Sequence, residues 1–168
     1  AVSYLRFEDC KGDIHCSFHV AKSRVAPLKA TTIPRLELAA AVVATRLDQM
    51  VRRESEIRID ASIFWTDSTC VLGYFNNDSK RFPTFVANRI ATIRETSSPS
   101  QWRYVTSDEN PADDASRGLT AEDLIRNHRW LLGLEFLWKL EKFWPSQITV
   151  PPAISHNDPE VKKKLQAF

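Results

Sequence analysis

The chain has 168 residues, of which 43% are hydrophobic and 26% are charged, with a formal net charge of +2. This size and composition predict one globular domain with an adequate core, and no stretch approaches the roughly 18 apolar residues of a membrane span. The three cysteines stand at spacings that fit neither a disulfide framework nor a zinc site. Because the net charge is small, any nucleic-acid binding has to depend on local patches.

Alternating residues predict an antiparallel hairpin at the start of the chain. Residues 2–8 and residues 14–20 alternate in polarity around a polar turn that contains Gly12. One side of the second strand is apolar and consists of Cys16, Phe18 and Val20. Residues 22–29 are predicted to form a further short edge strand that ends near Pro27.

A change of spacing from Pro34 onward predicts the clearest helix of the chain. Proline is favourable at an early helix position. The apolar residues then recur at intervals of three and four and are Leu36, Ala39, Ala40, Val43, Leu47 and Met50. This spacing is the clearest helix signal in the chain.

The middle of the chain predicts further strands and helices in alternation. A short apolar run with aromatic residues predicts a buried central strand over residues 62–65. The elements expected after it are helices at 69–75 and 84–95, a strand at 102–106, a loop-to-helix corner at 110–118, and one or two aromatic-rich helices within 119–143.

Three carboxylates converge in this layout. Glu37 lies in the first turn of the long helix, Asp67 closes the central strand, and Asp113 stands at the last corner. Ligands of open α/β sheets collect at the carboxyl ends of the strands, where Asp67 is expected. Clustered oxygen ligands favour Mg²⁺ or Mn²⁺, and two such ions can flank a phosphodiester during in-line attack. The same residues also suit turn, cap and helix-dipole roles.

Three motifs resemble one known family and occur in its order. They are TIPRLELAAAVVATRL (32–47), FWTDSTCVLGYF (64–75) and NPADDASRG (110–118). The sequence resembles ribonuclease H domains of BEL/Pao-type retrotransposons, and AKSRVAPLK and NHRWLLGLEFLWKLEKFWP look similar too. The resemblance implies an α/β ribonuclease H-like fold, a mixed sheet of antiparallel hairpin strands plus parallel strands, flanked by helices. It also implies that Glu37, Asp67 and Asp113 are the catalytic metal ligands, while Asp114 replaces an apolar residue and is expected to be exposed or beside the ligands.

One departure from the family pattern bears on activity. The first catalytic Asp of the family belongs on the first strand, before the segment that begins AVSYLR, and residues 1–8 contain no Asp. Asp9 falls at the far end of the strand, where we expect it to point into the hairpin turn. Losing one ligand of a two-metal site removes charge and geometry, so we expect weak metal binding and impaired cleavage.

The resemblance further implies a substrate, partners and boundaries. The expected activity is that of a ribonuclease H-type endonuclease, namely hydrolysis of RNA in RNA–DNA hybrids during reverse transcription, with two Mg²⁺ or Mn²⁺ ions as the expected cofactors. Reverse transcriptase and integrase regions of the same polyprotein are the expected partners. The cysteine usage and the lack of an apolar span separately predict an intracellular, cytoplasmic or nuclear location without a membrane. The expected divisions are a ribonuclease H-like domain at 1–120, an aromatic helical extension at 121–145 and a Pro/Lys-rich linker tail at 146–168.

Candidate substrate contacts come from basic and small polar residues. The nucleic-acid-binding residues predicted here are Lys22, Arg24, Arg35, Ser68 and Arg117. Trp65, Trp102 and Trp130 are expected in the core and not as base-stacking platforms, since they fall in predicted strands and an apolar helix.

Two other functions stay open on the sequence. The chain could be a non-catalytic nucleic-acid- or protein-binding module from a truncated or host-adopted retroelement. It could also be a structural spacer in which the aromatic segment at 130–144 docks onto a neighbour, which leaves those aromatic residues exposed in the isolated chain.

Overall fold

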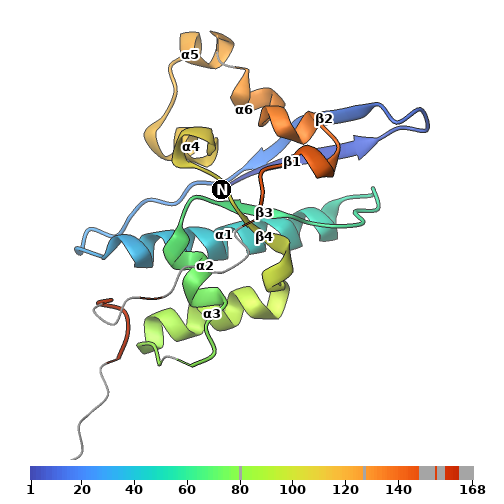
Figure 1. The fold of residues 1–168 in the computed structure, drawn as a ribbon. Helices are drawn as coiled ribbons and strands as arrows, with labels where there is room; N and C mark the ends of the chain where they lie inside the picture. Colours follow the sequence, from blue (N-terminus) through green and yellow to red (C-terminus); the bar gives the residue numbers. More distant parts are fainter. Residues whose placement is uncertain (80, 127, 148–153, 155–157, 163–168) are drawn as a thin grey trace, which may run out of the picture.

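The computed structural model describes residues 1–79, 81–126, 128–147, 154 and 158–162. The elements are β1 (Val2–Glu8), β2 (Ile14–Ala21), α1 (Ile33–Glu54), β3 (Phe64–Thr66), α2 (Thr69–Phe75), α3 (Thr84–Thr96), β4 (Trp102–Tyr104), α4 (Ala112–Arg117), α5 (Ala121–Arg126) and α6 (Arg129–Leu132). Figure 1 shows α1 crossing the middle of the molecule, with α2 and α3 on one side and the hairpin and α4 to α6 on the other. No helix within the described ranges is long and apolar enough to cross a membrane.

The predicted hairpin is confirmed. β1 and β2 pair in antiparallel register from Val2 opposite Ala21 to Glu8 opposite Ile14, and Gly12 closes the turn with a φ of 87°. The carboxylate of Asp9 accepts hydrogen bonds from the amides of Lys11 (2.8 Å) and Asp13 (3.0 Å). These backbone bonds lower the pKa of Asp9, which points into the turn as the sequence predicts.

The predicted edge strand at residues 22–29 is wrong. Pairing ends where the amide of Lys22 donates to the carbonyl of Ala1, and the following residues are coil with exposed side chains. Val25 and Leu28 are fully open to solvent. The segment has no strand neighbour among the described residues, and Pro27 has no amide to donate to one.

The strands form two pairs, which confirms the α/β fold class. β3 and β4 are parallel, from Phe64 opposite Trp102 to Thr66 opposite Tyr104, and the amide of Val105 extends the ladder to the carbonyl of Thr66. The hairpin and this parallel pair are separate two-stranded sheets in the described chain. An antiparallel hairpin, a parallel pair and flanking helices agree with a ribonuclease H-like fold.

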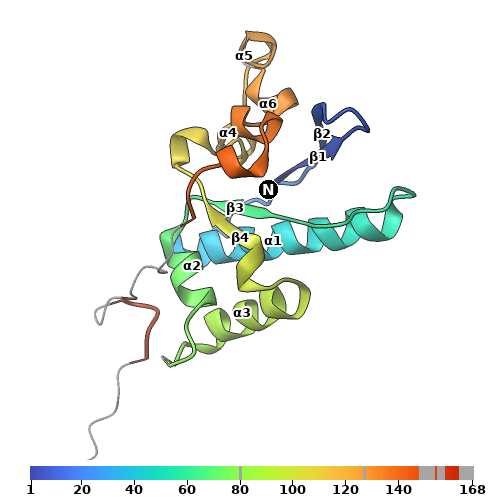
Figure 2. The ribbon, with the colours of Figure 1, turned by 45° about the vertical axis from the view of Figure 1, so that its right-hand side comes forward.

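The main core lies between α1, α2, α3 and the parallel pair, which Figure 2 shows stacked in that region. The helix at α1 is confirmed, and its periodic apolar residues are buried only in part, with Leu47 at 4% exposed. Leu36 and Met50 are each 36% exposed. The residues that α1 buries are Leu38, Ala41, Val42, Thr45, Leu47 and Val51. This set also recurs at three and four residues, so the pattern alone did not identify the face.

The C-terminal aromatic segment packs onto the hairpin and the parallel pair. The rings of Phe18 and Trp130 lie 5.5 Å apart, and the hydroxyl of Tyr4 donates to the carbonyl of Trp130 at 3.0 Å. Phe136 is buried beside Trp65, with ring centroids 4.7 Å apart. These contacts confirm that the side chains of Trp65 and Trp130 pack against other parts of the protein, as predicted.

Part of the tail lies against the domain. The hydroxyl of Tyr74 donates to both carboxylate oxygens of Asp158 (2.9 and 2.8 Å), and the amide of Lys162 donates to the carbonyl of Arg81. The boundaries at 120 and 145 stay predictions. These contacts show that residues 158–162 bind near α2.

Candidate active site

The candidate site lies where β3 ends. Asp67 follows the last residue of β3 and is half-buried. The amide of Ser68 donates to Oγ1 of Thr66 at 3.1 Å, which turns the chain from the strand into α2. The Thr66–Asp67–Ser68 motif therefore places its carboxylate at the carboxyl edge of the parallel pair, as the sequence predicts.

Ser68 joins Glu37 to this edge. Its hydroxyl donates to Oε2 of Glu37 and accepts from the amide of Val71 at 3.1 Å, so that it also caps α2. Ser68 is 5% exposed to solvent. Glu37 on α1 is therefore held beside the residue that follows Asp67.

The Glu37 carboxylate also affects a neighbouring thiol. Burial raises the pKa of Cys70, and the charges of Glu37 and Asp158 raise it further. Cys70 is half-buried on the first turn of α2. The region between α1 and α2 is thus acidic, and a cation placed there would be favoured electrostatically.

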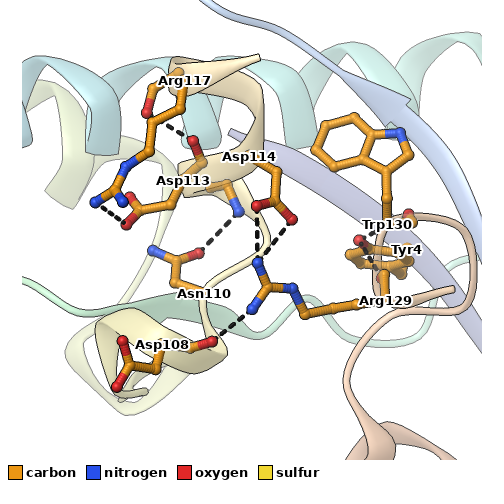
Figure 3. A network of polar contacts seen from close by, with 10 residues as sticks. Tyr4, Asp108, Asn110, Asp113, Asp114, Arg117, Arg129 and Trp130 are labelled. Atoms are coloured by element: carbon orange, nitrogen blue, oxygen red, sulfur yellow. Dashed lines mark hydrogen bonds and ion pairs between the residues drawn. The ribbon is translucent and has the colours of Figure 1, made fainter. Parts of the chain in front are cut away.

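Asp113 comes from α4, which begins shortly after β4. The side chain of Asn110 accepts from the amide of Ala112 at 3.0 Å, and the carbonyl of Asn110 accepts from the amide of Asp113 at 3.1 Å. These bonds form the predicted loop-to-helix corner (Figure 3). The Asp113 side chain is 32% exposed and pairs with Arg117 at 3.3 Å.

Asp114 has a different environment from its neighbour. Both of its carboxylate oxygens accept from the guanidinium of Arg129, each at 2.8 Å, and its side chain is 14% exposed. Arg129 also donates to the carbonyl of Asp108 (Figure 3). The expectation that Asp114 is exposed is wrong, because this carboxylate ties α4 to the C-terminal segment.

The three predicted metal ligands are not assembled into one group. Within the described ranges, no cluster of three or more His, Cys, Asp or Glu residues could hold a metal ion. The oxygen donors suit Mg²⁺ or Mn²⁺ chemically, but the arrangement fits such an ion only in part: Glu37 and Asp67 share the β3 edge through Ser68, while Asp113 pairs with Arg117. An open pocket of about 610 Å³ beside α6, between His128 and Trp138, contains none of these three carboxylates.

The predicted substrate contacts differ in what their side chains already bind. Lys22 and Arg24 are exposed in the coil before α1. Arg35 pairs with Glu160 at 2.8 Å, Arg117 pairs with Asp113, and the Ser68 hydroxyl bonds to Glu37. A role for each in nucleic-acid binding stays a prediction. For Ser68, the positioning of Glu37 is the observed contact.

Sequence reasoning named Ser68 as a substrate contact, but it did not predict that Ser68 and Arg129 position the carboxylates. The Ser68 hydroxyl and the Arg129 guanidinium each hold one acidic side chain. A signal existed for Ser68, since a serine immediately before a helix is a preferred cap residue. The pairing of Arg129 with Asp114 joins two distant segments, and no sequence pattern indicated it.

The structure is an α/β fold consistent with the ribonuclease H-like class. The family model described as Pao retrotransposon-like RNaseH-like domain matches residues 1–68. Over these residues the chain is similar to Pao-type ribonuclease H-like domains, which agrees with the resemblance of the motifs. Glu37 and Asp67 lie inside the match and Asp113 lies beyond it. No curated protein and no solved structure matches the chain.

Proposed function

We propose that this chain is a metal-dependent nuclease module that hydrolyses the RNA strand of RNA–DNA hybrids during reverse transcription of a retroelement. The supporting observation is the hydrogen bond from Ser68 to Glu37, which brings the helix Glu next to the strand-end Asp67. The family match over residues 1–68 supports a nuclease-like module and contains both carboxylates.

The chemistry would divide between residues and ions. Glu37, Asp67 and Asp113 would hold Mg²⁺ or Mn²⁺, which when bound activates water and neutralises the leaving 3′ oxygen. Ser68 orients Glu37, and it does so while nearly inaccessible to solvent. Asp113 is exposed enough to exchange its Arg117 partner for another cation.

Activity of this chain is expected to be low. β1 carries one acidic residue, Glu8, at the exposed end next to the hairpin turn. Among the described residues the carboxylates do not form a group of three. A site with too few convergent ligands binds a divalent ion weakly. We therefore expect cleavage only at high concentrations of Mn²⁺, on the order of millimolar, and slower cleavage with Mg²⁺.

The test is cleavage of an end-labelled RNA–DNA hybrid by the full chain, compared with Asp67→Asn. We expect metal-dependent cleavage whose rate falls by at least about 100-fold in the variant, because the variant loses a direct metal ligand. Even residues that only contact a metal ligand typically change metal affinity or activity by about 10 to 100-fold when they are replaced. Asp60→Asn is the matched control, because Asp60 is 79% exposed and pairs with Arg58 away from the site. Cleavage that persists unchanged in Asp67→Asn contradicts the proposal.

A second candidate function is a non-catalytic module that binds nucleic acid or a protein partner. The observation that favours it is the lack of a three-ligand cluster in the described chain. It predicts that the folded chain binds the hybrid without cleaving it at any metal concentration. In either function, we propose an intracellular setting with reverse transcriptase and integrase regions of the same polyprotein as neighbours.

A further inference from the structure

Four arginines form a second feature of interest, away from the carboxylate edge. Arg35 and Arg46 lie on the same side of α1, about three turns apart. Arg89 lies on α3, which packs along α1. Arg24 is exposed in the coil that leads into α1. We refer to Arg24, Arg35, Arg46 and Arg89 as the arginine surface.

An aromatic ring organises part of this surface. The guanidinium groups of Arg35 and Arg89 lie over the same ring, that of Phe85, at 5.2 and 3.3 Å from its centroid. Arg89 also donates to the carbonyl of Phe85 at 3.0 Å. Stacking on an aromatic ring leaves the edge of a guanidinium able to donate to an oxyanion.

The arginine surface carries little compensating negative charge. Burial lowers the pKa of Arg89, and the like charges of Arg24, Arg46 and Arg35 lower it further, so each of these three arginines lies close enough to Arg89 to repel it. Of the carboxylates in the described ranges, Glu160 is the one that pairs with this surface. Arginines elsewhere, such as Arg52, Arg94 and Arg129, pair with carboxylates of the domain.

Glu160 shows what the surface can bind. Its carboxylate accepts from Arg35 at 2.8 Å and from the hydroxyl of Thr32 at 2.7 Å, and the residue is 1% exposed. Two donors around one carboxylate form a built oxyanion contact at the start of α1. The other three residues of the arginine surface have no carboxylate partner among the described residues. They are Arg24, Arg46 and Arg89.

The surface is separate from the candidate active site. Arg35 and Glu37 are two residues apart on a helix and therefore point about 200° apart around its axis. Glu37 bonds to Ser68 at the β3 edge, whereas Arg35 faces Phe85 on α3. Along α1 the row from Arg35 to Arg46 extends roughly 16 Å, long enough to meet several phosphates of one duplex strand.

We propose that the arginine surface binds the phosphate backbone of a nucleic-acid duplex, and that Glu160 occupies the place of one phosphate at its Arg35 end. The inference rests on the proposed function for the choice of an RNA–DNA hybrid as the duplex. Phosphate contacts are independent of base sequence, so the surface positions the duplex without selecting a site on it.

The experiment measures binding of a fluorescent RNA–DNA hybrid to the full chain by anisotropy, without divalent metal and over a series of salt concentrations. Arg46→Ala and Arg89→Ala are each expected to weaken binding by roughly fivefold at low salt and to reduce the salt slope by about 1. Arg58→Ala is the control, because Arg58 is 92% exposed and lies outside the surface. Thermal unfolding checks that each variant is folded.

Arg46 provides the cleaner variant, since its side chain has no hydrogen bond or ion pair to another described residue, while Arg89 also stacks on Phe85. Glu160→Gln is expected to strengthen binding by a few fold, because it removes the carboxylate that competes with phosphate. Folded Arg46→Ala that binds like the wild type overturns the proposal, as does a wild type that does not bind. Weaker binding by Glu160→Gln overturns the assignment of Glu160.

The outcomes separate this inference from the proposed function. Binding that depends on Arg46 without any cleavage supports the surface and contradicts the nuclease. Cleavage that depends on Asp67 together with unchanged binding by Arg46→Ala supports the nuclease and contradicts the surface.

Discussion

Asp114→Ala is expected to lower the free energy of unfolding by about 2 to 3 kcal/mol, whereas Asp113→Ala lowers it by less than about 0.5 kcal/mol. Asp114 accepts two hydrogen bonds from Arg129 with a side chain that is 14% exposed. Removing one partner of a largely buried pair is costly, because the other charge loses its compensation. Asp113 pairs with Arg117, which is 78% exposed, and such surface pairs contribute little.

Urea denaturation followed by tryptophan fluorescence measures both free energies. The cleavage rate should show the reverse order, with the larger loss in Asp113→Ala, because the sequence resemblance predicts Asp113 as a metal ligand and the Asp114 carboxylate is occupied by Arg129. Arg129→Met combined with Asp114→Ala gives a double-mutant cycle for the pair. Equal destabilisation by the two Asp variants would contradict the assignment of separate roles to these neighbours.

Trp102→Ala is expected to destabilise the chain by about 3 to 5 kcal/mol, as other large-to-small substitutions of buried aromatic residues do. Trp102 is 6% exposed, stacks on Phe64 with centroids 4.8 Å apart and meets Phe75 at 5.8 Å. Its indole N–H donates to the hydroxyl of Ser97 at 2.9 Å. The ring therefore holds the parallel pair against α2.

Phe143→Ala is the control for Trp102→Ala, because Phe143 is 63% exposed and its loss should change stability by no more than about 0.5 kcal/mol. Chemical denaturation of the two variants gives the comparison. If Trp102 were a base-stacking platform, its substitution would weaken hybrid binding and leave stability unchanged. That result would contradict the placement of Trp102 in the core.

Local patterns predicted most elements because each was specified by neighbouring residues. Period-two alternation indicated the hairpin, and the boundaries of α2 agree with the sequence prediction at Thr69–Phe75. Period 3.6 indicated α1 but not its buried face. The first half of α1 carries small and apolar residues on several sides, so two different sets of residues fit the same spacing. Packing against α3 determines which set is buried.

Features that depend on distant segments were not predictable. Residues 22–29 have strand-like composition, but a strand needs a neighbour, and none of the described residues pairs with them. Glu160 lies far along the chain from Arg35 and is buried against it. Composition indicated a linker there, and only the folded chain shows that an acidic residue of the tail neutralises a basic residue of α1.

The candidate site was predictable in part for a related reason. Glu37 and Asp67 were identified from motifs and lie at one edge because the strand end and helix start are fixed by local structure. The sequence carried no information on the partners of Asp113 and Asp114. Their adjacent positions on α4 place one carboxylate towards Arg117 and the other towards Arg129.

The central claim is that Glu37 and Asp67 belong to one divalent-metal site, and calorimetric titration of the full chain with Mn²⁺ tests it most directly. We expect weak binding by the wild type and by Asp60→Asn, a loss of affinity of at least about tenfold in Glu37→Gln and in Asp67→Asn, and no further loss in the double variant. Binding of Mn²⁺ that is unchanged in both single variants would contradict the account.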